Sequence, residues 1–468
     1  MTEQAKVPAI RFAGFTDPWE QRKFGDCFEF LKSNTLSRAG LNGENGTARN
    51  VHYGDILIKF GDCLDGERSD LPFITDDTVL PKFAGSILRE GDVIFADTAE
   101  DEAAGKCVEL RKLPKEPTIS GLHTIPARPR FFFGTGYLGH YLNSDAYHRQ
   151  LLPLMQGIKV ISVSKAALQD TQVRFPGLSE QAAIGAALSE IDNLITLHQR
   201  KYDKLVILKK SMLEKLFPKD GESVPEIRFA GFTDPWEQRK LEDIANRVTR
   251  KNEGESDLPL TISSQYGLVD QRTFFNNQVA SKDMSGYYLL RKGEFAYNKS
   301  TSGDSPWGAV KRLVRYEKGC VSTLYICFGL DGADPDFLVT YYETDRWYKA
   351  VQMIAAEGAR NHGLLNIAPN DFFDTALILP PSREEQELIG LFFARLDNLI
   401  TLHQRKRESR IIRVRSFIWL AGDISGIGVS AYQPEKRRPY DRRQHQRRNV
   451  VLRLLRAMDQ RIQGRCNS

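Results

Sequence analysis

The sequence lacks the features of secreted and membrane proteins. Its first residues, MTEQAKVPAIRF, contain no apolar signal-peptide core, and no apolar run approaches the roughly 18 residues that a membrane span needs. The six cysteines are scattered and form no C-x-x-C pair, which predicts reduced, mostly buried thiols. We therefore expect a cytoplasmic protein with no membrane segment.

Motifs of the common enzyme classes are also missing. There is no G-x-x-x-x-G-K-[ST] loop for ATP, no G-x-S-x-G nucleophile elbow and no H-E-x-x-H motif, and the eight histidines show no metal-ligand spacing. Gly134, Gly136 and Gly139 match G-x-G-x-x-G, but no acidic residue follows about twenty positions later, as a dinucleotide fold requires. The same letters resemble the F-x-G-x-G of adenine methyltransferases, yet no N-P-P-[YF] follows. We expect these glycines to form turns, and we predict no catalytic residue, metal site or cofactor in this chain.

The positive charge of the chain lies at its C-terminal end. The net charge is +5, whereas residues 421–468 alone hold eleven Lys/Arg against four Asp/Glu, so the rest of the chain is slightly acidic. Any nucleic-acid surface in the globular part must therefore be a local patch. The Arg-rich end, which includes Arg442, Arg443, Arg447 and Arg448, is either a solvated or disordered tail or a functional tail that adds salt-sensitive affinity for nucleic acid.

Two stretches of sequence occur twice. The residues IRFAGFTDPWEQRK occupy 10–23 and 227–240, and the residues DNLITLHQRK occupy 192–201 and 397–406. The offsets of 217 and 205 residues indicate duplication of a unit of about two hundred residues, which is far longer than a solenoid repeat. Because the sequence between the repeats differs in the two halves, we predict two different modules in one frame.

Each DNLITLHQRK copy lies within a long helical pattern. Apolar residues recur at alternating steps of three and four, the spacing of a coiled-coil seam, and the first helix is predicted over 179–217. The seam residues are Ile184, Leu188, Ile191, Ile195 and His198 in the first helix and Ile389, Phe393, Leu396, Ile400 and His403 in the second. We expect the two histidines to be buried and hydrogen-bonded. The predicted fold class is α+β, with two mixed α/β modules separated by two long helices packed as an antiparallel coiled coil.

Proline and glycine signals, together with the repeats, predict the domain boundaries. They place a first module at 1–175, a first long helix at 176–222, a second module at 223–380, a second long helix at 381–420 and the basic tail at 421–468. Short apolar runs predict strands and longer ones predict helices. The expected strands include Asp55–Phe60, Asp92–Ala96, Arg130–Phe133, Gly157–Ile161, Leu258–Ile262, Gly293–Tyr297 and Val321–Phe328, and the expected module helices are Leu138–Leu154 and Asp336–Glu357.

The frame resembles a known family. D-P-W-E-Q-R-K at the start of each module, followed by E-Q and D-N-L-I-T-L-H-Q-R-K in each long helix, is similar to the DNA-specificity subunits of type I restriction–modification systems. The resemblance covers about residues 1–415. It implies that each module is a target-recognition domain for one half of an asymmetric, bipartite site on double-stranded DNA. It also implies that the helices dock two methyltransferase (modification) subunits and set the half-site spacing. Separate restriction (translocase) subunits complete the implied complex, with S-adenosylmethionine, ATP and Mg bound by the partners.

Candidate DNA contacts are polar residues of the module loops, because phosphates attract Lys and Arg while base edges are read by Arg, Lys, Asn, Gln, Ser or Thr. The candidates are Arg49, Asn50, His52, Lys59 and Lys159 in the first module and Lys299, Ser300, Thr301, Ser302, Arg360, Asn361 and His362 in the second. Two alternatives stay open. A two-module scaffold would bind proteins without reading DNA, and a stand-alone methyltransferase would bind S-adenosylmethionine by itself.

Overall fold

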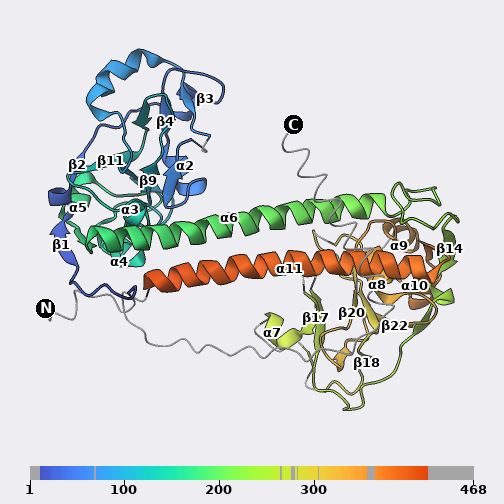
Figure 1. The fold of residues 1–468 in the computed structure, drawn as a ribbon. Helices are drawn as coiled ribbons and strands as arrows, with labels where there is room; N and C mark the ends of the chain where they lie inside the picture. Colours follow the sequence, from blue (N-terminus) through green and yellow to red (C-terminus); the bar gives the residue numbers. More distant parts are fainter. Residues whose placement is uncertain are drawn as a thin grey trace. The chain divides into compact units, whose positions relative to one another are not determined.

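The computed structural model describes residues 11–67, 70–263, 266–275, 280–281, 283–303, 305–355 and 364–419 (Figure 1). The chain divides into two units. The first contains the described residues up to Lys201 together with those from His403 on, and the second contains the residues from Tyr202 to Leu402. Each unit therefore holds one module and a part of both long helices.

The first unit is built on two mixed sheets. One sheet has the order β2-β11-β7-β9-β5 and the other β10-β4-β6-β3, while β1 pairs with β13 and β12 with β8. The strands are β1 Glu20–Lys23, β2 Phe28–Phe30, β3 Leu41–Asn42, β4 Arg49–Val51, β5 Cys63–Asp65, β6 Phe73–Ile74, β7 Val93–Ala96, β8 Thr98–Ala99, β9 Cys107–Arg111, β10 Thr118–Ser120, β11 Thr124–Pro129, β12 Ile161–Ser162 and β13 Gln172–Phe175.

Short helices flank these sheets and bury aromatic side chains against them. The main core contains Phe24, Phe28, Phe95 and Tyr137, all almost fully buried. The helices are α1 Phe24–Cys27, η2 Arg38–Gly40, α2 Tyr53–Ile58, η3 Asp77–Ser86, α3 Tyr137–Leu142, α4 Asp145–His148, η4 Leu152–Leu154 and α5 Lys165–Asp170, followed by the long helix α6 Leu178–Lys215.

The second unit has a smaller antiparallel sheet of order β15-β22-β19-β20 and the strand pairs β14-β23, β16-β17 and β18-β21. The strands are β14 Glu237–Lys240, β15 Ala245–Arg247, β16 Leu260–Ser263, β17 Gly267–Asp270, β18 Tyr288–Arg291, β19 Phe295–Asn298, β20 Ala309–Arg312, β21 Lys318–Val321, β22 Ile326–Leu330 and β23 Ala376–Leu379. The helices are η5 Leu241–Asp243, α7 Gln271–Phe275, α8 Pro335–Tyr341, α9 Tyr348–Ile354, α10 Pro369–Phe373 and the long helix α11 Arg383–Trp419.

The two long helices pack together. In the second unit Lys209 of α6 hydrogen-bonds to Asp397 of α11 at 2.6 Å, and Phe217, just after α6, contacts Phe393 with ring centroids 6.3 Å apart. Since the numbering rises along one helix as it falls along the other, the helices are antiparallel there. The α+β prediction, with two modules and a pair of long helices, is confirmed.

Several predicted elements differ from the structure. The run Asp55–Phe60 is not a strand, because its first residues lie in α2, where His52 accepts a hydrogen bond from the backbone N–H of Gly54 and caps the helix. The strand predicted at Arg130–Phe133 is also wrong, since β11 ends at Pro129. Both predicted module helices are interrupted: α3, α4 and η4 replace the first, while α8 and α9 lie within the second. The single strand predicted at Val321–Phe328 is instead two strands, β21 and β22, separated by a turn. Of the strand predicted at Gly157–Ile161, only Ile161 lies in a strand, β12.

Among the described residues, no helix is both long enough and apolar enough to cross a bilayer.

Candidate functional site

The duplicated frame forms the same ion pair in both units. In the first unit the guanidinium of Arg11 donates to both carboxylate oxygens of Glu180, at 2.7 and 2.6 Å. In the second, Arg228 donates to both oxygens of Glu385, at 2.7 and 2.8 Å. The carboxylates are almost fully buried, and each hydrogen-bonded carboxylate raises the pKa of its arginine. Each pair therefore ties the start of a module to its long helix.

The residue after each glutamate provides a second, equivalent link. Gln181 accepts a hydrogen bond from the backbone N–H of Gly134 at 2.8 Å, and its amide donates to the carbonyl of a proline before the helix. Gln386 accepts from the backbone N–H of Asp334 at 2.9 Å and also donates to a proline carbonyl. Two identical polar residues thus hold modules of different sequence to the helices.

Close helix–module contact also explains two equivalent glycines. A Cβ atom on Gly185 would lie 2.3 Å from the carbonyl oxygen of Thr135, and one on Gly390 would lie 2.6 Å from the backbone nitrogen of Phe337. Real Cβ atoms do not approach backbone atoms so closely. The absence of a side chain therefore lets each long helix lie directly on its module.

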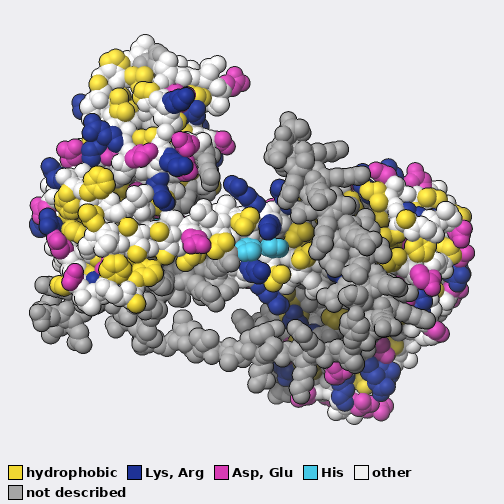
Figure 2. Space-filling view, in the orientation of Figure 1, with side chains coloured by type: hydrophobic (Ala, Val, Ile, Leu, Met, Phe, Trp, Pro, Cys, Tyr) yellow, Lys and Arg dark blue, Asp and Glu magenta, His cyan; other side chains and the backbone are white. Residues whose placement is uncertain are grey.

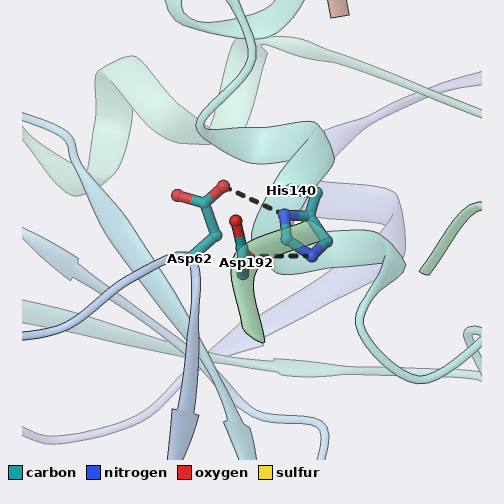
Figure 3. Close-up of side chains that lie close together, drawn as sticks. All are labelled: Asp62, His140 and Asp192. Atoms are coloured by element: carbon teal, nitrogen blue, oxygen red, sulfur yellow. Dashed lines mark hydrogen bonds and ion pairs between the residues drawn. The ribbon is translucent and has the colours of Figure 1, made fainter. Parts of the chain in front are cut away.

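The repeated aspartate meets a histidine in the first unit. Asp192 lies 3.7 Å from Nε2 of His140, whose Nδ1 lies 3.0 Å from Asp62 (Figure 3). His140 is 1% exposed, and burial raises the pKa of Asp192. Within the described residues, these are the side chains close enough to share a metal ion. Each ring nitrogen faces its own carboxylate, however, so the histidine accounts for the cluster as a polar link between module and helix.

The equivalent aspartate has a different partner in the second unit. The ammonium of Lys209 lies between Asp397, at 2.6 Å, and Glu343, at 2.7 Å. Burial alone would lower the pKa of Lys209, but the two carboxylates outweigh it and raise the pKa. The same repeated residue therefore joins a different charged group in each unit.

The predicted seam residues lie on the inner faces of the long helices. The buried seam residues are Leu188, Ile389, Phe393 and Leu396. Ile184, the first seam residue of α6, packs against the core of the first unit. The remaining isoleucines of the seam, Ile191, Ile195 and Ile400, are half-buried. Within the first unit, Nδ1 of His198 and Nδ1 of His403 form a hydrogen bond of 2.8 Å, so one ring donates a proton that the other accepts.

The glycine-rich run beside α3 binds a carboxylate of the protein itself. The backbone N–H groups of Gly136 and Gly139 donate to Glu109 at 2.5 and 2.9 Å. Gly136 has φ +83°, the left-handed conformation that glycine adopts without strain, and it caps α3. The expectation that these glycines form turns is confirmed at Gly136 and wrong at Gly139, which lies within α3.

A cleft of about 1260 Å³ lies between the module of the first unit and one face of α6. Its module wall is formed by residues 59–65, 89–92, 109–112 and 128–135, and its helix wall by residues of α6 between 189 and 200. The basic residues of the lining are Lys59, Arg89, Arg111, Lys112, Arg128, Arg130 and Arg200. The lining also contains the carboxylates of Asp65, Glu90, Asp92, Glu109 and Asp192, so cationic and anionic side chains from distant parts of the chain converge there.

Some of these cations are held by the protein and others are not. Arg128 is bound to the buried carboxylate of Asp92 at 2.7 Å. Arg89 and Arg200 are exposed and form no ion pair within the part of the chain that the structure describes, and Arg130 is exposed. Figure 2 shows Lys and Arg mixed with Asp and Glu over the visible surface of the first unit. Positive charge that a ligand could contact is thus confined to local sites, in line with the slightly acidic balance of the chain outside residues 421–468.

The cleft also contains an exposed aromatic ring. Phe132 is 86% exposed, whereas Phe133 is 9% exposed and stacks on Phe28 with centroids 5.8 Å apart. Phe131 stacks on Phe133, with a centroid distance of 5.0 Å. The two neighbours therefore anchor the segment and hold Phe132 outward, beside Arg130.

The predicted DNA contacts of the first module separate into buried and exposed residues. Asn50 is fully buried and His52 is 6% exposed, so neither side chain reaches the surface. Arg49 is half-buried, pairs with a glutamate and lies over a phenylalanine ring. Lys59 is exposed, pairs with an aspartate and lines the large cleft, and Lys159 is exposed elsewhere in the module.

The predicted contacts of the second module are only partly described. In the run Lys299–Ser302, the ammonium of Lys299 donates to a backbone carbonyl at 3.2 Å, and burial lowers the pKa of Lys299. Ser300 and Ser302 are exposed. Arg360, Asn361 and His362 lie outside the described residues.

The sequence did not single out Arg89, Phe132 and Arg200 as candidates, and Arg130 appeared only as the first residue of a predicted strand. These residues come from three separate segments, so no local pattern unites them. The three consecutive phenylalanines at 131–133 are the one signal in the sequence, and such a run predicts a strand.

Comparison with known proteins shows similarity in sequence and in fold. No protein-family model matches the sequence. The chain is 25% identical over 232 residues to a Methanocaldococcus jannaschii protein that bears the name of a type I restriction enzyme MjaX specificity subunit, covering 48% of this chain and 52% of that protein. It is 29% identical over 94 residues to the type I restriction enzyme MjaVIII specificity subunit of the same organism, covering 19% of this chain and 22% of that protein. The chain thus spans about half the length of the first relative.

The fold is similar to the crystal structure of a type-I restriction-modification system S subunit from M. genitalium. The TM-score is 0.52 at 11% sequence identity, over 90% of this chain and 100% of that chain; at this identity the likeness concerns the fold. Both named relatives are specificity subunits by name, and the solved structure is called an S subunit. In sequence, the chain is thus similar over part of its length to two proteins named as specificity subunits of type I restriction enzymes, and these similarities agree with the resemblance of the duplicated frame.

Proposed function

We propose that this chain is the non-catalytic, DNA-reading subunit of a type I restriction–modification complex. The observation that carries the proposal is the pair of identical frames, each with the same Arg–Glu ion pair, around two modules of different structure. One scaffold that presents two different surfaces suits a target with two different halves. The modules within 1–175 and 223–380 would be the two target-recognition domains.

The cleft of the first unit is the proposed DNA interface of that unit. Arg89, Arg130 and Arg200 offer positive charge, and phosphate contacts supply much of the affinity of DNA-binding proteins. Lys59 lies in the same lining. For the second half-site we propose the Lys299–Ser302 run. The polar segment Arg360–His362 remains a candidate from the sequence.

The remaining roles belong to partners in this proposal. The helix pair docks two methyltransferase subunits that bind S-adenosylmethionine, and restriction subunits supply ATP- and Mg-dependent cleavage. The length of the helices sets the distance between the half-sites. Four residues inserted after Lys201 add about one turn and roughly 6 Å, so the gap should grow by about one or two base pairs at roughly 3.4 Å each while the half-site sequences stay the same.

Methylome sequencing of the host, with and without the gene, tests the function. Loss of methylation at one asymmetric, bipartite motif is expected when the gene is removed. A mobility-shift assay of the chain with its methyltransferase subunits tests DNA reading directly, since a protein-binding scaffold would shift no duplex. Methyl transfer by the purified chain alone would contradict the non-catalytic role.

A further inference from the structure

A tight hairpin in the first module ends in exposed apolar side chains. The backbone N–H of Gln156 donates to the carbonyl of Ser162 at 3.0 Å, and that of Ser162 donates to the carbonyl of Gln156 at 2.8 Å. Gly157 makes the turn with φ +118°, and a Cβ atom there would collide with the carbonyl oxygen of Val160. Between the paired residues, Ile158 is 99% exposed and Val160 is 56% exposed. The hairpin therefore holds two β-branched side chains in contact with solvent.

The hairpin is joined to the end of a central strand, and the second unit has the same connection. The backbone N–H of Val163, just after the hairpin, donates at 2.8 Å to the carbonyl of Asp97, the residue directly after β7. In the second unit the N–H of Leu365 donates at 3.0 Å to the carbonyl of Lys299, the residue directly after β19. The residues that precede the two donors are IKVIS and RNHGL. The sequence that enters the same connection therefore differs between the modules.

This difference indicates the kind of ligand. In the proposed complex the two methyltransferase subunits are copies of one protein, so a surface that docks them is expected to be the same in both units, as the repeated helix segments are. The two halves of the DNA target are what differs between the units. A divergent, exposed element at an equivalent connection therefore suits base reading rather than partner docking.

The shape and composition of the hairpin suit the major groove. That groove is about 12 Å wide and admits a two-stranded β-ribbon, and apolar side chains within it contact the methyl group of thymine. The tip of the hairpin contains a single cation, Lys159, whereas exposed carboxylates follow β8 at residues 100–102. Contact with base edges, rather than attraction of phosphates, is therefore the interaction that the hairpin offers.

Base reading by the hairpin is compatible with phosphate binding at the cleft. The cleft lining includes residues 89–92, directly before β7, whereas the hairpin is joined to the chain directly after β7. At about 3.3 Å per residue, the stretch from Asp92 to Thr98 covers roughly 20 Å, which is the length of about six base pairs. A duplex that lies along this strand would reach both places.

We propose that the hairpin at 156–162 is a base-reading element of the first module, in which Ile158 and Val160 contact thymine methyl groups in the major groove of one half-site. The inference rests on the proposed function and deepens it, because it names the chemical groups that the first module reads. The two apolar side chains would then determine specificity without supplying charge.

The experiment uses duplexes that carry the methylated motif, with deoxyuridine in place of thymidine in one half-site at a time, since uracil lacks only the methyl group. Binding to the chain assembled with its methyltransferase subunits is measured. Uracil in one half-site should weaken binding by the wild-type complex roughly three- to tenfold, the effect of one or two buried methyl groups. The double variant Ile158→Ala with Val160→Ala should bind the thymine duplex about as weakly and should no longer distinguish uracil from thymine in that half-site.

Ile58→Ala is the matched control, because Ile58 is another highly exposed isoleucine of the same module and lies outside the hairpin. This variant should keep the full preference for thymine. Equal binding of the uracil and thymine duplexes by the wild-type complex in both half-sites would overturn the inference, as would a double variant that still prefers thymine in the same half-site. Loss of a methyltransferase subunit from a double variant with unchanged preference would also overturn it and would make the hairpin a protein-docking surface. Failure of the proposed function looks different, because the wild-type complex would then bind no duplex.

Discussion

Replacing Arg228 with alanine removes one half of a buried ion pair. Its guanidinium makes two hydrogen bonds of 2.7 and 2.8 Å to Glu385 and a third, also of 2.7 Å, to the carbonyl of Asp234. The carboxylate of Glu385 is 1% exposed, so the variant leaves it without a counter-ion and without access to water. Removing one partner of a buried pair costs about 3–5 kcal/mol, and we expect a loss of unfolding free energy of that size.

Urea unfolding, followed by both tryptophan fluorescence and circular dichroism, measures the change. Arg239→Ala is the matched control: this arginine pairs with Glu237 in the same frame, but both side chains are about half exposed, and such pairs contribute about 0–1 kcal/mol. The double variant Arg228→Met with Glu385→Leu should recover much of the loss, because it removes the uncompensated charge. A loss below about 1 kcal/mol in Arg228→Ala, or a double variant no more stable than the single one, would refute the reasoning.

Three further changes probe the contacts of the long helices. Burial, reinforced by the neighbouring His198, lowers the pKa of His403, so the unfolded chain binds the proton more tightly than the folded one. The contact should therefore contribute its full stability above about pH 6.5 and lose it as the pH falls below that value. Melting curves should show this loss in the wild type and much less of it in His403→Gln. Gly185→Ala should destabilise the first unit by about 1–3 kcal/mol in urea unfolding through the clash with the module backbone, whereas Gly177→Ala, with open space around it, should not. Lys209→Met should lower the free energy of unfolding by about 2 kcal/mol in the same assay, because its two carboxylate partners then face each other without a cation; unchanged stability would contradict the importance of that contact.

Strand and helix assignment within the modules shows where local sequence is ambiguous. The run Asp55–Phe60 has the apolar character of a buried strand, and periodicity alone does not separate a short buried strand from a short helix. In the structure, its first residues continue a helix that His52 caps. Asp92–Ala96, by contrast, contains β7 as predicted: a Gly-Asp turn signal precedes both runs, but only this one continues with the β-branched and aromatic residues Val93, Ile94 and Phe95 in succession.

The sequence by itself determined the frame of this protein. Identical segments at fixed offsets revealed the duplication, and the three-and-four apolar spacing located the first long helix at 179–217, close to the observed Leu178–Lys215. Both signals are patterns within short segments of the sequence, so they can be recognised without the three-dimensional structure. The resemblance to specificity subunits followed from the same segments.

Only the tertiary structure decided which polar side chains reach the surface and which distant residues meet. Asn50 looks like a base reader in the sequence but is fully buried, whereas Arg89, Arg130 and Arg200 come together in one cleft although more than a hundred residues separate the first from the last. The physical reason is that exposure and convergence depend on how sheets and helices pack, which involves residues far apart in the chain. The repeated aspartate illustrates this, since identical sequence places Asp192 beside His140 and Asp397 beside Lys209.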